Sequence, residues 1–526
     1  MYILKGGLIV DGTRSKPYNA TLVINDGIIE DITTNEINCE GSIIDVSGNI
    51  ISPGFIDIHS HSDISYFLPY TPESKIYQGV TTEIIGNCGS SVVPLSKENK
   101  MEVSNFFNSI TEIKSSKTLK SNNIEEYKKE LAEAVLPVNL GILIGHGTLR
   151  GTVVGFEDRR PTPEEMDEMC NHLERELKNG AFGLSLGLIY PPGNFSKTEE
   201  LIRLAKVLYN NNRILTVHLR NEGDRVFEAV DEMIYIAKVT GVHLHISHLK
   251  LMGKKQWQNA ARLLEKIDHA ISSGLTITCD QYPYDATATS LSALIPRWAH
   301  NGGTEKMLER LKHHNSKLDN DIESEMDNRG GPRSVTISGT KGYIGDVEGL
   351  NIEEASEMLK LNAVETVKYI LINAKGNATA VYHTLAFEDV VNIMKKMYVS
   401  VGSDGFAFSY DQRHTTTNPH PRNCGTYPQY FETIRENNIL SIEDAVYKAT
   451  RLPAETLGIK DRGVLLPGKA ADITVFNFNN IKDNSTYLSS VAKPTGIDHV
   501  FVNGKPVILD GEKKGLDNGK VLLSHR

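Results

Sequence analysis

The stretch GFIDIHSHSD, residues 54–63, carries two histidines one residue apart directly after an apolar run. Side chains on a strand alternate between its two faces, so Asp57, His59 and His61 share one face. Imidazole and carboxylate groups at a strand end are typical metal ligands. The competing interpretation is structural, because a single histidine at such a position is usually only hydrogen-bonded. The rest of the chain decides between these two interpretations.

The middle of the chain alternates strand-like runs with helix-like periods. VNLGILIGHG precedes TPEEMDEMCNHLERELKNG, whose Thr-x-x-Glu opening and Gly180 are helix start and stop signals. AFGLSLGLIY, RILTVHLRN and VHLHISH are each followed by a further amphipathic segment. Such alternation predicts an α/β fold with a parallel sheet, and the number of units favours a closed (β/α)8 TIM barrel over residues 55–459. No Gly-rich nucleotide-binding fingerprint follows any of these strands, which removes the main reason to prefer an open sheet.

Both ends of the chain have a different character from the middle. Short, Gly-punctuated strand patterns fill residues 1–54 and return in residues 460–526, so we expect the termini to form one small β domain. Residues 288–349 interrupt the regular alternation and are predicted to be an insertion within the barrel. The helical spacing of 363–373 and the runs TAVYHTL and YVSVGSDG are predicted to resume the barrel pattern.

Composition limits the classes of protein and partner. The chain has 526 residues, 40% hydrophobic and 23% charged, which is ordinary globular usage. The net charge of −10 disfavours a nucleic-acid partner, and no apolar run is long enough for a membrane span. Five scattered cysteines (Cys39, Cys88, Cys170, Cys279 and Cys424) and the lack of a signal sequence predict free thiols and a cytoplasmic location. Nothing in the sequence indicates an oligomeric state.

Further polar residues end the other predicted strands. In RILTVH, His218 shares a face with Thr216, and in VHLHISH, His248 shares a face with Ile246, so that His245 is expected to point the other way. Asp404 ends the strand in YVSVGSDG. Barrel enzymes place their chemistry at these carboxyl ends of the strands, so the side chains are predicted to converge.

Cys88, in the Gly-rich turn GNCGSS, adds a thiol to the same set. A lone cysteine is more often a small buried hydrophobe, and an Asp before Gly is usually a turn residue. It is the number of such residues at one end of one barrel that favours a metal site. Thiolate with imidazole makes zinc the first choice of metal, while manganese and iron stay open at this point.

The chain resembles the D-aminoacylase (N-acyl-D-amino-acid deacylase) family within the amidohydrolase superfamily. The resemblance runs from about residue 45 to 510 in family order and rests on the motifs PGFIDIHSHSD, QGVTTEIIGNCGSS, GLSLGLIYPPG, VHLRNE, HISHLK, YPYDA, VGSDG, HPRNCGTYP and DRGVLLPGKAADITVF. It implies a barrel, a small β domain built from both termini, and hydrolysis of the amide bond of N-acyl-D-amino acids to a carboxylate and a free D-amino acid.

The resemblance also implies a set of metal ligands. One tightly held zinc ion is expected on Cys88, His218 and His248. A second, weaker site is expected on His59, His61 and Asp404. Related enzymes bridge two metals with a carboxylated lysine, but AFGLSLGL has no lysine, so Cys88 is expected in the bridging position. Asp404 is expected to act as general base and then as general acid.

Recognition of the small-molecule substrate is expected from cations and tyrosines. By resemblance, Lys250, Tyr282 and Arg422 hold the α-carboxylate, with Tyr190 nearby, since Arg binds a carboxylate through two donors. Lys250 also lies two residues beyond His248 on the same strand face. Arg297 is a candidate for the side-chain pocket, where it would favour an acidic substrate such as an N-acyl-D-glutamate.

Several alternatives stay open from sequence. The chain could be another amidohydrolase, such as an isoaspartyl dipeptidase, a hydantoinase or a dihydroorotase. A non-catalytic scaffold on the same fold is a further alternative, opposed by the intact set of ligands. His146 ends a predicted strand without an assigned role, and residues 405–420 form a loop longer than the resemblance predicts.

Overall fold

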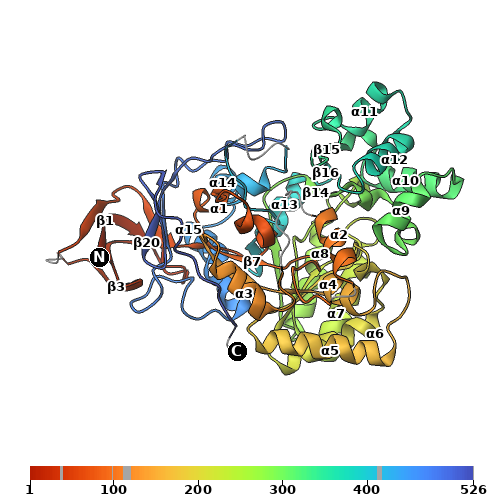
Figure 1. Cartoon of the computed structure of the whole chain (residues 1–526). Coiled ribbons are helices and arrows are strands. Elements are labelled where there is room, and N and C mark those ends of the chain that lie inside the picture. The colour runs from red at the N-terminus through yellow and green to blue at the C-terminus, as the bar shows by residue number, and fades with distance from the viewer. Residues whose placement is uncertain (36–39, 97–98, 111–119, 412–417, 525–526) are drawn as a thin grey trace.

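The computed structural model describes residues 1–35, 40–96, 99–110, 120–411 and 418–524. Cys39 and the loop section 412–417 lie outside these described residues. Strands from both chain ends form one sheet, in the order β21-β20-β19-β18-β5-β1-β2-β3 with β4 paired to β1. It lies at the left of Figure 1 and contains the N-terminus. Its strands are β1 (Tyr2–Ile9), β2 (Tyr18–Asn25), β3 (Ile28–Thr33), β4 (Ser42–Asp45), β5 (Ile50–Pro53), β18 (Ile473–Phe476), β19 (Ile497–Val502), β20 (Lys505–Leu509) and β21 (Glu512–Lys513).

Parallel strands in the middle of the chain form two further sheets, with the orders β6-β7-β8 and β17-β13-β12-β11-β10-β9. All neighbouring pairs in both sheets run parallel, as the βα alternation predicted. The strands are β6 (Phe55–Asp57), β7 (Val80–Ile85), β8 (Asn139–Ile142), β9 (Ile144–Gly145), β10 (Gly183–Gly187), β11 (Ile214–His218), β12 (His243–Ile246), β13 (Ile277–Gln281) and β17 (Val399–Val401).

Hydrogen bonds link these two parallel sheets at both edges. At one edge, only Leu143 separates β8 from β9, and its amide donates to the Ile85 carbonyl at 2.9 Å. At the other edge, the Asp404 amide donates to the His59 carbonyl at 2.8 Å. The His61 amide donates to the Gly405 carbonyl at 2.9 Å. The residues that follow β17 are therefore hydrogen-bonded to the residues that follow β6.

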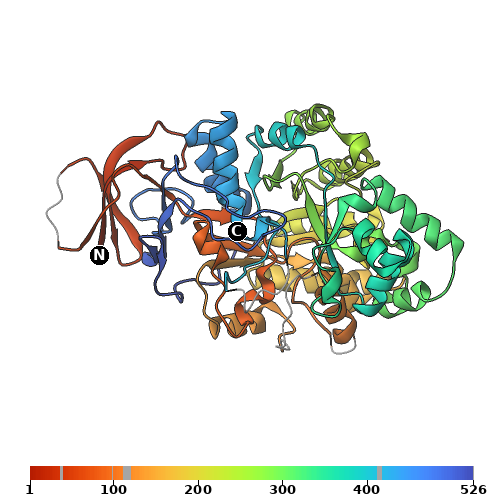
Figure 2. The ribbon, with the colours of Figure 1, turned by 90° about the horizontal axis from the view of Figure 1, so that it is seen from above.

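Helices connect the parallel strands and pack their apolar sides against them, in one core that includes Leu173, Leu204, Met233 and Ile267. Figures 1 and 2 show these helices around the parallel strands. The predicted capping box of the first long helix is present at Thr162 and Glu165. The helices are α1 (Ser74–Tyr77), α2 (Lys100–Ile110), α3 (Ile124–Ala132), α4 (His146–Val153), α5 (Pro163–Lys178), α6 (Thr198–Asn210), α7 (Val226–Thr240), α8 (Ala260–Ser272), α13 (Phe387–Met394), α14 (Arg422–Asn437), α15 (Ile442–Ala449) and α16 (Arg451–Leu457).

A separate module follows β13 in the chain and has its own apolar core, from Leu291 to Tyr382. It lies at the upper right of Figure 1, far from the terminal sheet. Its core runs past residue 349, where the sequence pattern had the insertion end, because β14 and β15 both pair antiparallel with the later strand β16. Its elements are β14 (Thr287–Ser290), β15 (Val335–Gly339), β16 (Thr379–Tyr382), α9 (Gly303–Leu311), α10 (Ser316–Asn328), α11 (Ile352–Leu359) and α12 (Ala363–Asn373).

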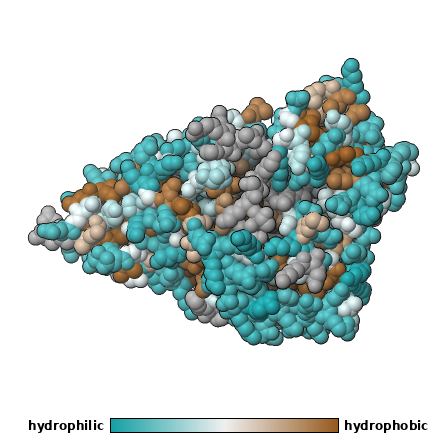
Figure 3. All heavy atoms as spheres, in the orientation of Figure 1, coloured by the Kyte–Doolittle hydropathy of each residue, from teal (hydrophilic) through white to brown (hydrophobic). Residues whose placement is uncertain are grey.

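Among the described residues, none of the helices combines the length and apolar character that a membrane crossing needs. The face of the molecule seen in Figure 3 is mostly hydrophilic, with smaller groups of apolar residues between.

The C-terminal tail returns to the parallel strands, where Val521 bridges Leu140 and the Arg213 guanidinium donates to the Ser524 carbonyl at 3.2 Å. The C-terminal tail is thus joined to the parallel strands in the middle of the chain.

Candidate metal centre

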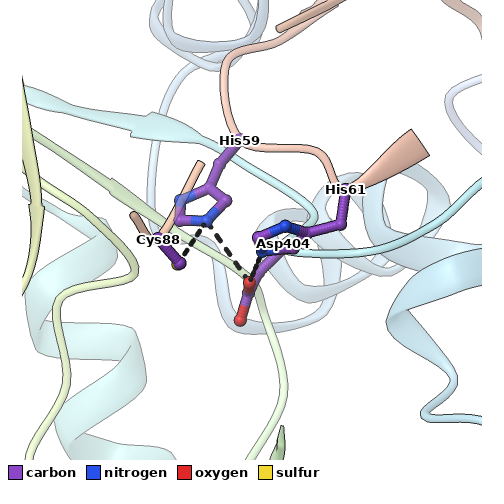
Figure 4. A group of neighbouring side chains, drawn as sticks. All are labelled: His59, His61, Cys88 and Asp404. Carbon is purple, nitrogen blue, oxygen red and sulfur yellow. Dashed lines mark hydrogen bonds and ion pairs between the residues drawn. The ribbon is translucent and has the colours of Figure 1, made fainter. Parts of the chain in front are cut away.

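Two groups of metal-type ligands meet at the ends of the parallel strands. The first contains His59, His61, Cys88 and Asp404, and the second contains Cys88, His218 and His248. Within each group, one ligand atom per residue lies within 4.8 Å of all the others. Cys88 belongs to both groups, so its thiol stands between them. Figure 4 shows His59 above the Cys88 sulfur and both histidines directed at the Asp404 carboxylate.

The donor atoms lie close enough together to share one metal ion. Cys88 Sγ lies 3.4 Å from His248 Nε2 and 3.2 Å from His59 Nε2. His248 Nε2 lies 2.9 Å from His218 Nδ1. Four-coordinate zinc with ordinary bond lengths holds its ligand atoms about 3.3 to 3.6 Å apart. The thiol and the two imidazoles are therefore close enough to share one ion, and the chemistry of these donors is that of zinc.

The second group has the same spacing with a carboxylate in it. Asp404 Oδ1 lies 3.0 Å from His61 Nε2 and 3.3 Å from His59 Nε2. Its other oxygen, Oδ2, accepts from Arg422 Nη1 at 2.6 Å. One oxygen of Asp404 thus faces His59 and His61, and the other is bonded to the guanidinium of Arg422.

Unusual backbone conformations direct three of these side chains. Cys88, His248 and Asp404 have φ values of 51°, 36° and 50°, in the left-handed region that costs energy for residues other than glycine. The Cys88 turn also packs tightly on β10, since a Cβ at Gly187 would lie 2.0 Å from the Cys88 carbonyl oxygen. The glycines of this turn and of β10 are thus required for the close approach that places the thiol.

Side-chain alternation placed His248 at the site and directed His245 away from it. The prediction for His248 agrees with the structure, but the prediction for His245 is wrong. His245 Nε2 lies 2.8 Å from Asp280 Oδ2, and the same oxygen lies 3.1 Å from His59 Nδ1. His245 therefore points toward the site and not away from it. Regular alternation stops after β12, where the positive φ of His248 turns its side chain inward as well.

Asp280 forms hydrogen bonds with a residue of each ligand group, His59 and His248. Besides the two imidazoles, it accepts a hydrogen bond at 2.9 Å from the His248 backbone amide through Oδ1. Burial disfavours its charge, yet His59 and His245 hold the pKa of this carboxyl group well below its usual range. A carboxylate behind a metal-binding histidine fixes the ring orientation and raises its basicity. Asp280 was not predicted from the sequence, although it lies one residue before the end of β13 in the run LTITCDQYPY.

Replacing Asp280 with asparagine should therefore weaken metal binding by the group that contains His59 about 10- to 100-fold, while all candidate ligands stay in place. Competition of the zinc-loaded protein with a coloured chelator measures the change, and circular dichroism checks the fold. Asp285→Asn is the matched control, because that exposed carboxylate bonds only Tyr487 among the described side chains. Equal zinc affinity in Asp280→Asn and wild type would contradict the orienting role.

A second buried network supports the strand end that carries Asp404. Lys75 Nζ donates to Asp57 Oδ2 at 2.7 Å and to Ser403 Oγ at 2.8 Å, and lies 3.2 Å from Glu83. Asp57 in turn accepts from the Ser403 amide at 2.8 Å. Asp57 thus stabilises the backbone next to Asp404 and belongs to neither ligand group. Lys75 and Glu83 were also missed, since their contacts join segments far apart in the chain.

The charges of the site favour ionised ligands. Burial alone would raise the pKa of the Cys88 thiol, but His59 and His248 beside it hold that pKa well below its usual range. Burial likewise opposes ionisation of Asp404, yet Arg422, His248 and His59 keep the pKa of its carboxyl group well below the ordinary value. A thiolate and a carboxylate are the forms that a metal ion and a general base require.

Four predicted substrate residues lie around the same centre. Lys250 Nζ is 2.8 Å from His248 Nδ1 and donates to Glu222 Oε1 at 2.7 Å. Tyr282 lies between two cations, 5.8 Å from Lys250 Nζ and 5.1 Å from the Arg422 guanidinium, measured to its ring centre. Tyr190 contacts the edge of the His218 ring and hydrogen-bonds Thr289 at 2.7 Å. The structure therefore brings Lys250, Tyr282, Arg422 and Tyr190 to one place.

Glu222 was not identified from the sequence, although it ends the motif VHLRNE. It faces the two histidines of the second group, 3.1 Å from His248 Nδ1 and 3.5 Å from His218 Nε2. The spacing of four residues after His218 in a loop gives no periodic signal.

Arg297 and His146 lie outside the ligand groups. Arg297 lines the cavity in front of the site, where its side chain is 43% exposed and donates to Asp158 at 2.6 Å. His146 begins α4 and is buried, with Nε2 2.8 Å from Glu200 Oε1. His146 is thus engaged in a buried contact with α6.

Comparison with known proteins gives consistent matches. Residues 50–507 match the model of the amidohydrolase family. The N-acyl-D-aspartate deacylase of Alcaligenes xylosoxydans xylosoxydans is 30% identical over 99% of this chain and 94% of its own length. The D-aminoacylase of the same organism is 30% identical over 99% of this chain and 97% of its own.

Among solved structures, one of N-acyl-D-glutamate deacylase from Bordetella bronchiseptica superposes with a TM-score of 0.83 and 28% identity. It covers 99% of both chains. That protein was crystallised with zinc and a phosphonate inhibitor that mimics the tetrahedral intermediate.

Proposed function

Because the chain belongs to the amidohydrolase family, we propose that it is a zinc-dependent enzyme that hydrolyses N-acyl-D-amino acids to a carboxylate and a free D-amino acid. Relatives matched over almost the whole chain bear the names D-aminoacylase and N-acyl-D-aspartate deacylase. The observation that carries the proposal is the position of the Cys88 thiol between His59 and His248, at 3.2 and 3.4 Å.

The proposed ligands divide into two sites. Cys88, His218 and His248 would hold the tight zinc ion, and His59, His61 and Asp404 would form a weaker position. Bound zinc polarises the amide carbonyl and lowers the pKa of a water molecule. The β10 sequence GLSLG has no lysine that could bridge two metals, which supports Cys88 in that place.

Asp404 is the proposed proton carrier. Its carboxylate takes a proton from the attacking water and later delivers it to the leaving nitrogen, because an amine is a poor leaving group unless it is protonated. Arg422, bonded to Oδ2, keeps the carboxylate ionised and oriented before the reaction. Lys250, Tyr282 and Arg422 are proposed to hold the substrate α-carboxylate, with Tyr190 against the acyl-amino group.

Zinc-loaded protein assayed on open-chain and cyclic amides tests the reaction class. We expect release of amino acid from N-acetyl- and N-formyl-D-amino acids, and no opening of hydantoin or dihydroorotate. Opening of a cyclic amide without cleavage of the linear ones would favour the hydantoinase or dihydroorotase alternative. Cleavage of a β-aspartyl dipeptide alone would favour the isoaspartyl dipeptidase, and no turnover at all would favour the scaffold.

We also infer the architecture behind this site. Hydrogen bonds at both edges of the two parallel sheets support a closed (β/α)8 barrel over residues 55–459 in which β8 and β9 act as one strand. The shared sheet of β1 to β5 and β18 to β21 supports a small domain from 1–54 and 460–526. The separate apolar core supports an insertion over 287–382, longer than 288–349. Among the described cysteines, Cys88, Cys170 and Cys279 form no disulfide, which supports a cytoplasmic location.

A further inference from the structure

A cavity of about 330 Å³ opens in front of the candidate metal centre. Next to the candidate metal centre, Tyr190, His218 and Asp404 line the cavity. Farther out, residues of the insertion line it. At about 30 Å³ per water molecule, it has space for roughly ten waters, which is more than a small acyl group requires. The outer part of the cavity, which residues of the insertion line, therefore has space for the part of a substrate that extends beyond the scissile bond.

Four arginines line this cavity, and three of them are paired with a carboxylate. The pairs are Arg220 with Glu232 at 2.9 Å, Arg225 with Glu228 at 2.6 Å, and Arg297 with Asp158 at 2.6 Å. A guanidinium that already holds a carboxylate gains less from a second one. Arg297, the candidate from sequence, is therefore not the strongest anion-binding group here.

Arg329, at the end of α10, is the fourth arginine and has a different environment. Its Nη2 donates to the Ala293 carbonyl at 3.4 Å, and its guanidinium stands 4.9 Å from the centre of the Tyr382 ring. Its Nε is buried and makes no hydrogen bond within the described part of the chain, and no described carboxylate forms an ion pair with it. Glu325, one turn earlier, lines the same cavity; burial raises the pKa of its carboxyl group, and the charge of Arg329 opposes this rise without an ion pair between the two side chains.

Two contacts join Arg329 and its neighbour Asn328 to segments that also reach the candidate metal centre. The backbone before it packs on the loop after β12, since a Cβ at Gly253 would lie 2.5 Å from the Asn328 carbonyl oxygen. Gly253 follows Lys250 by three residues. On the other side, Ala293 follows Ala288, whose carbonyl accepts from Arg422 Nη2 at 3.1 Å. The two segments that contact this region of α10 are therefore the one that follows Lys250 and the one whose Ala288 carbonyl bonds Arg422.

We propose that Arg329 selects substrates that carry a second carboxylate, on the amino-acid side chain or on the acyl chain. This inference rests on the proposed deacylase function and adds the substrate class: dianionic N-acyl-D-amino acids. Arg329 is partly buried, and its Nε is an unpartnered donor. A guanidinium that is not already paired binds a carboxylate through charge-assisted hydrogen bonds, and the same cavity gives a neutral chain no such partner.

The test compares three substrates: N-acetyl-D-glutamate, N-succinyl-D-methionine and the neutral N-acetyl-D-methionine. In Arg329→Met, the kcat/KM ratio of a dianionic to the neutral substrate should fall about tenfold or more, the usual effect of one lost charge-assisted contact. Arg329→Lys keeps the charge and should restore part of the ratio. Arg225→Met is the matched control, because Arg225 lines the same cavity but is paired with Glu228.

Each outcome has a distinct meaning. A selective loss with N-acetyl-D-glutamate places the second carboxylate on the side chain, and a selective loss with the succinyl substrate places it on the acyl chain. An unchanged ratio in Arg329→Met, or an equal fall in Arg225→Met, overturns the proposal. A wild type that cleaves N-acetyl-D-methionine but neither dianion also overturns it while leaving the deacylase function standing. A wild type that cleaves no linear amide refutes the proposed function itself.

Discussion

Replacing Cys88 with alanine is expected to remove the tightly held zinc ion and to lower kcat/KM on the order of 10³-fold or more. The thiol is the one group common to both ligand clusters, at 3.4 Å from His248 and 3.2 Å from His59. Without it, His218 and His248 are two neutral donors, and two imidazoles alone hold zinc weakly. Metal content per chain after dialysis and the rate of N-acetyl-D-amino acid hydrolysis measure both effects.

Two variants serve as controls for this result. Cys170→Ala removes a half-buried thiol on α5 and should keep zinc and activity. His59→Ala should reduce activity far more than zinc content, because His59 belongs to the weaker position. Complete loss of zinc in His59→Ala, with retention in Cys88→Ala, would mean that the two positions are reversed.

Replacing Asp404 with asparagine should reduce kcat by about 10²- to 10⁴-fold, the range for loss of a general acid-base group. Asparagine keeps the size of the side chain but cannot take a proton from water. Zinc should remain bound, because Cys88, His218 and His248 are unchanged. Turnover kinetics and metal analysis on the same sample separate the two effects.

The contact with Arg422 makes this variant informative. Arg422 Nη1 bonds Asp404 Oδ2 at 2.6 Å, so the ion pair is lost with the carboxylate. A thermal unfolding curve beside that of Asp285→Asn shows whether the fold survives, since Asp285 is an exposed aspartate outside the ligand groups. A folded, zinc-loaded Asp404→Asn with a normal rate would refute the role of Asp404 as proton carrier.

The sequence predicted which side chains come together better than it predicted the contacts around them. His59, His61, Cys88, His218, His248 and Asp404 come together because each one ends or follows a parallel strand, and strand ends are visible in the pattern. Asp280, Glu222 and Lys75 were missed because their roles depend on partners far away in the chain. Local periodicity contains no information about which distant segments will meet.

The errors in detail have the same origin. Strict alternation gave the wrong side for His245, because the backbone at His248 adopts a positive φ that no strand pattern predicts. The sequence pattern placed the end of the proposed insertion at residue 349, because the strand 379–382 resembles a barrel strand locally, whereas the apolar core of this module continues to Tyr382. Only its antiparallel pairing with β14 and β15 assigns it to the insertion.

The most direct test of the central claim is the handedness of the amino acid released from a racemic substrate. Zinc-loaded protein incubated with N-acetyl-DL-methionine should stop at about half conversion, the signature of an enzyme complementary to one enantiomer. Chromatography on a chiral column should find only D-methionine free and only the L-amide left. Release of L-methionine, or release of both enantiomers at equal rates, would contradict the assignment as an N-acyl-D-amino-acid deacylase.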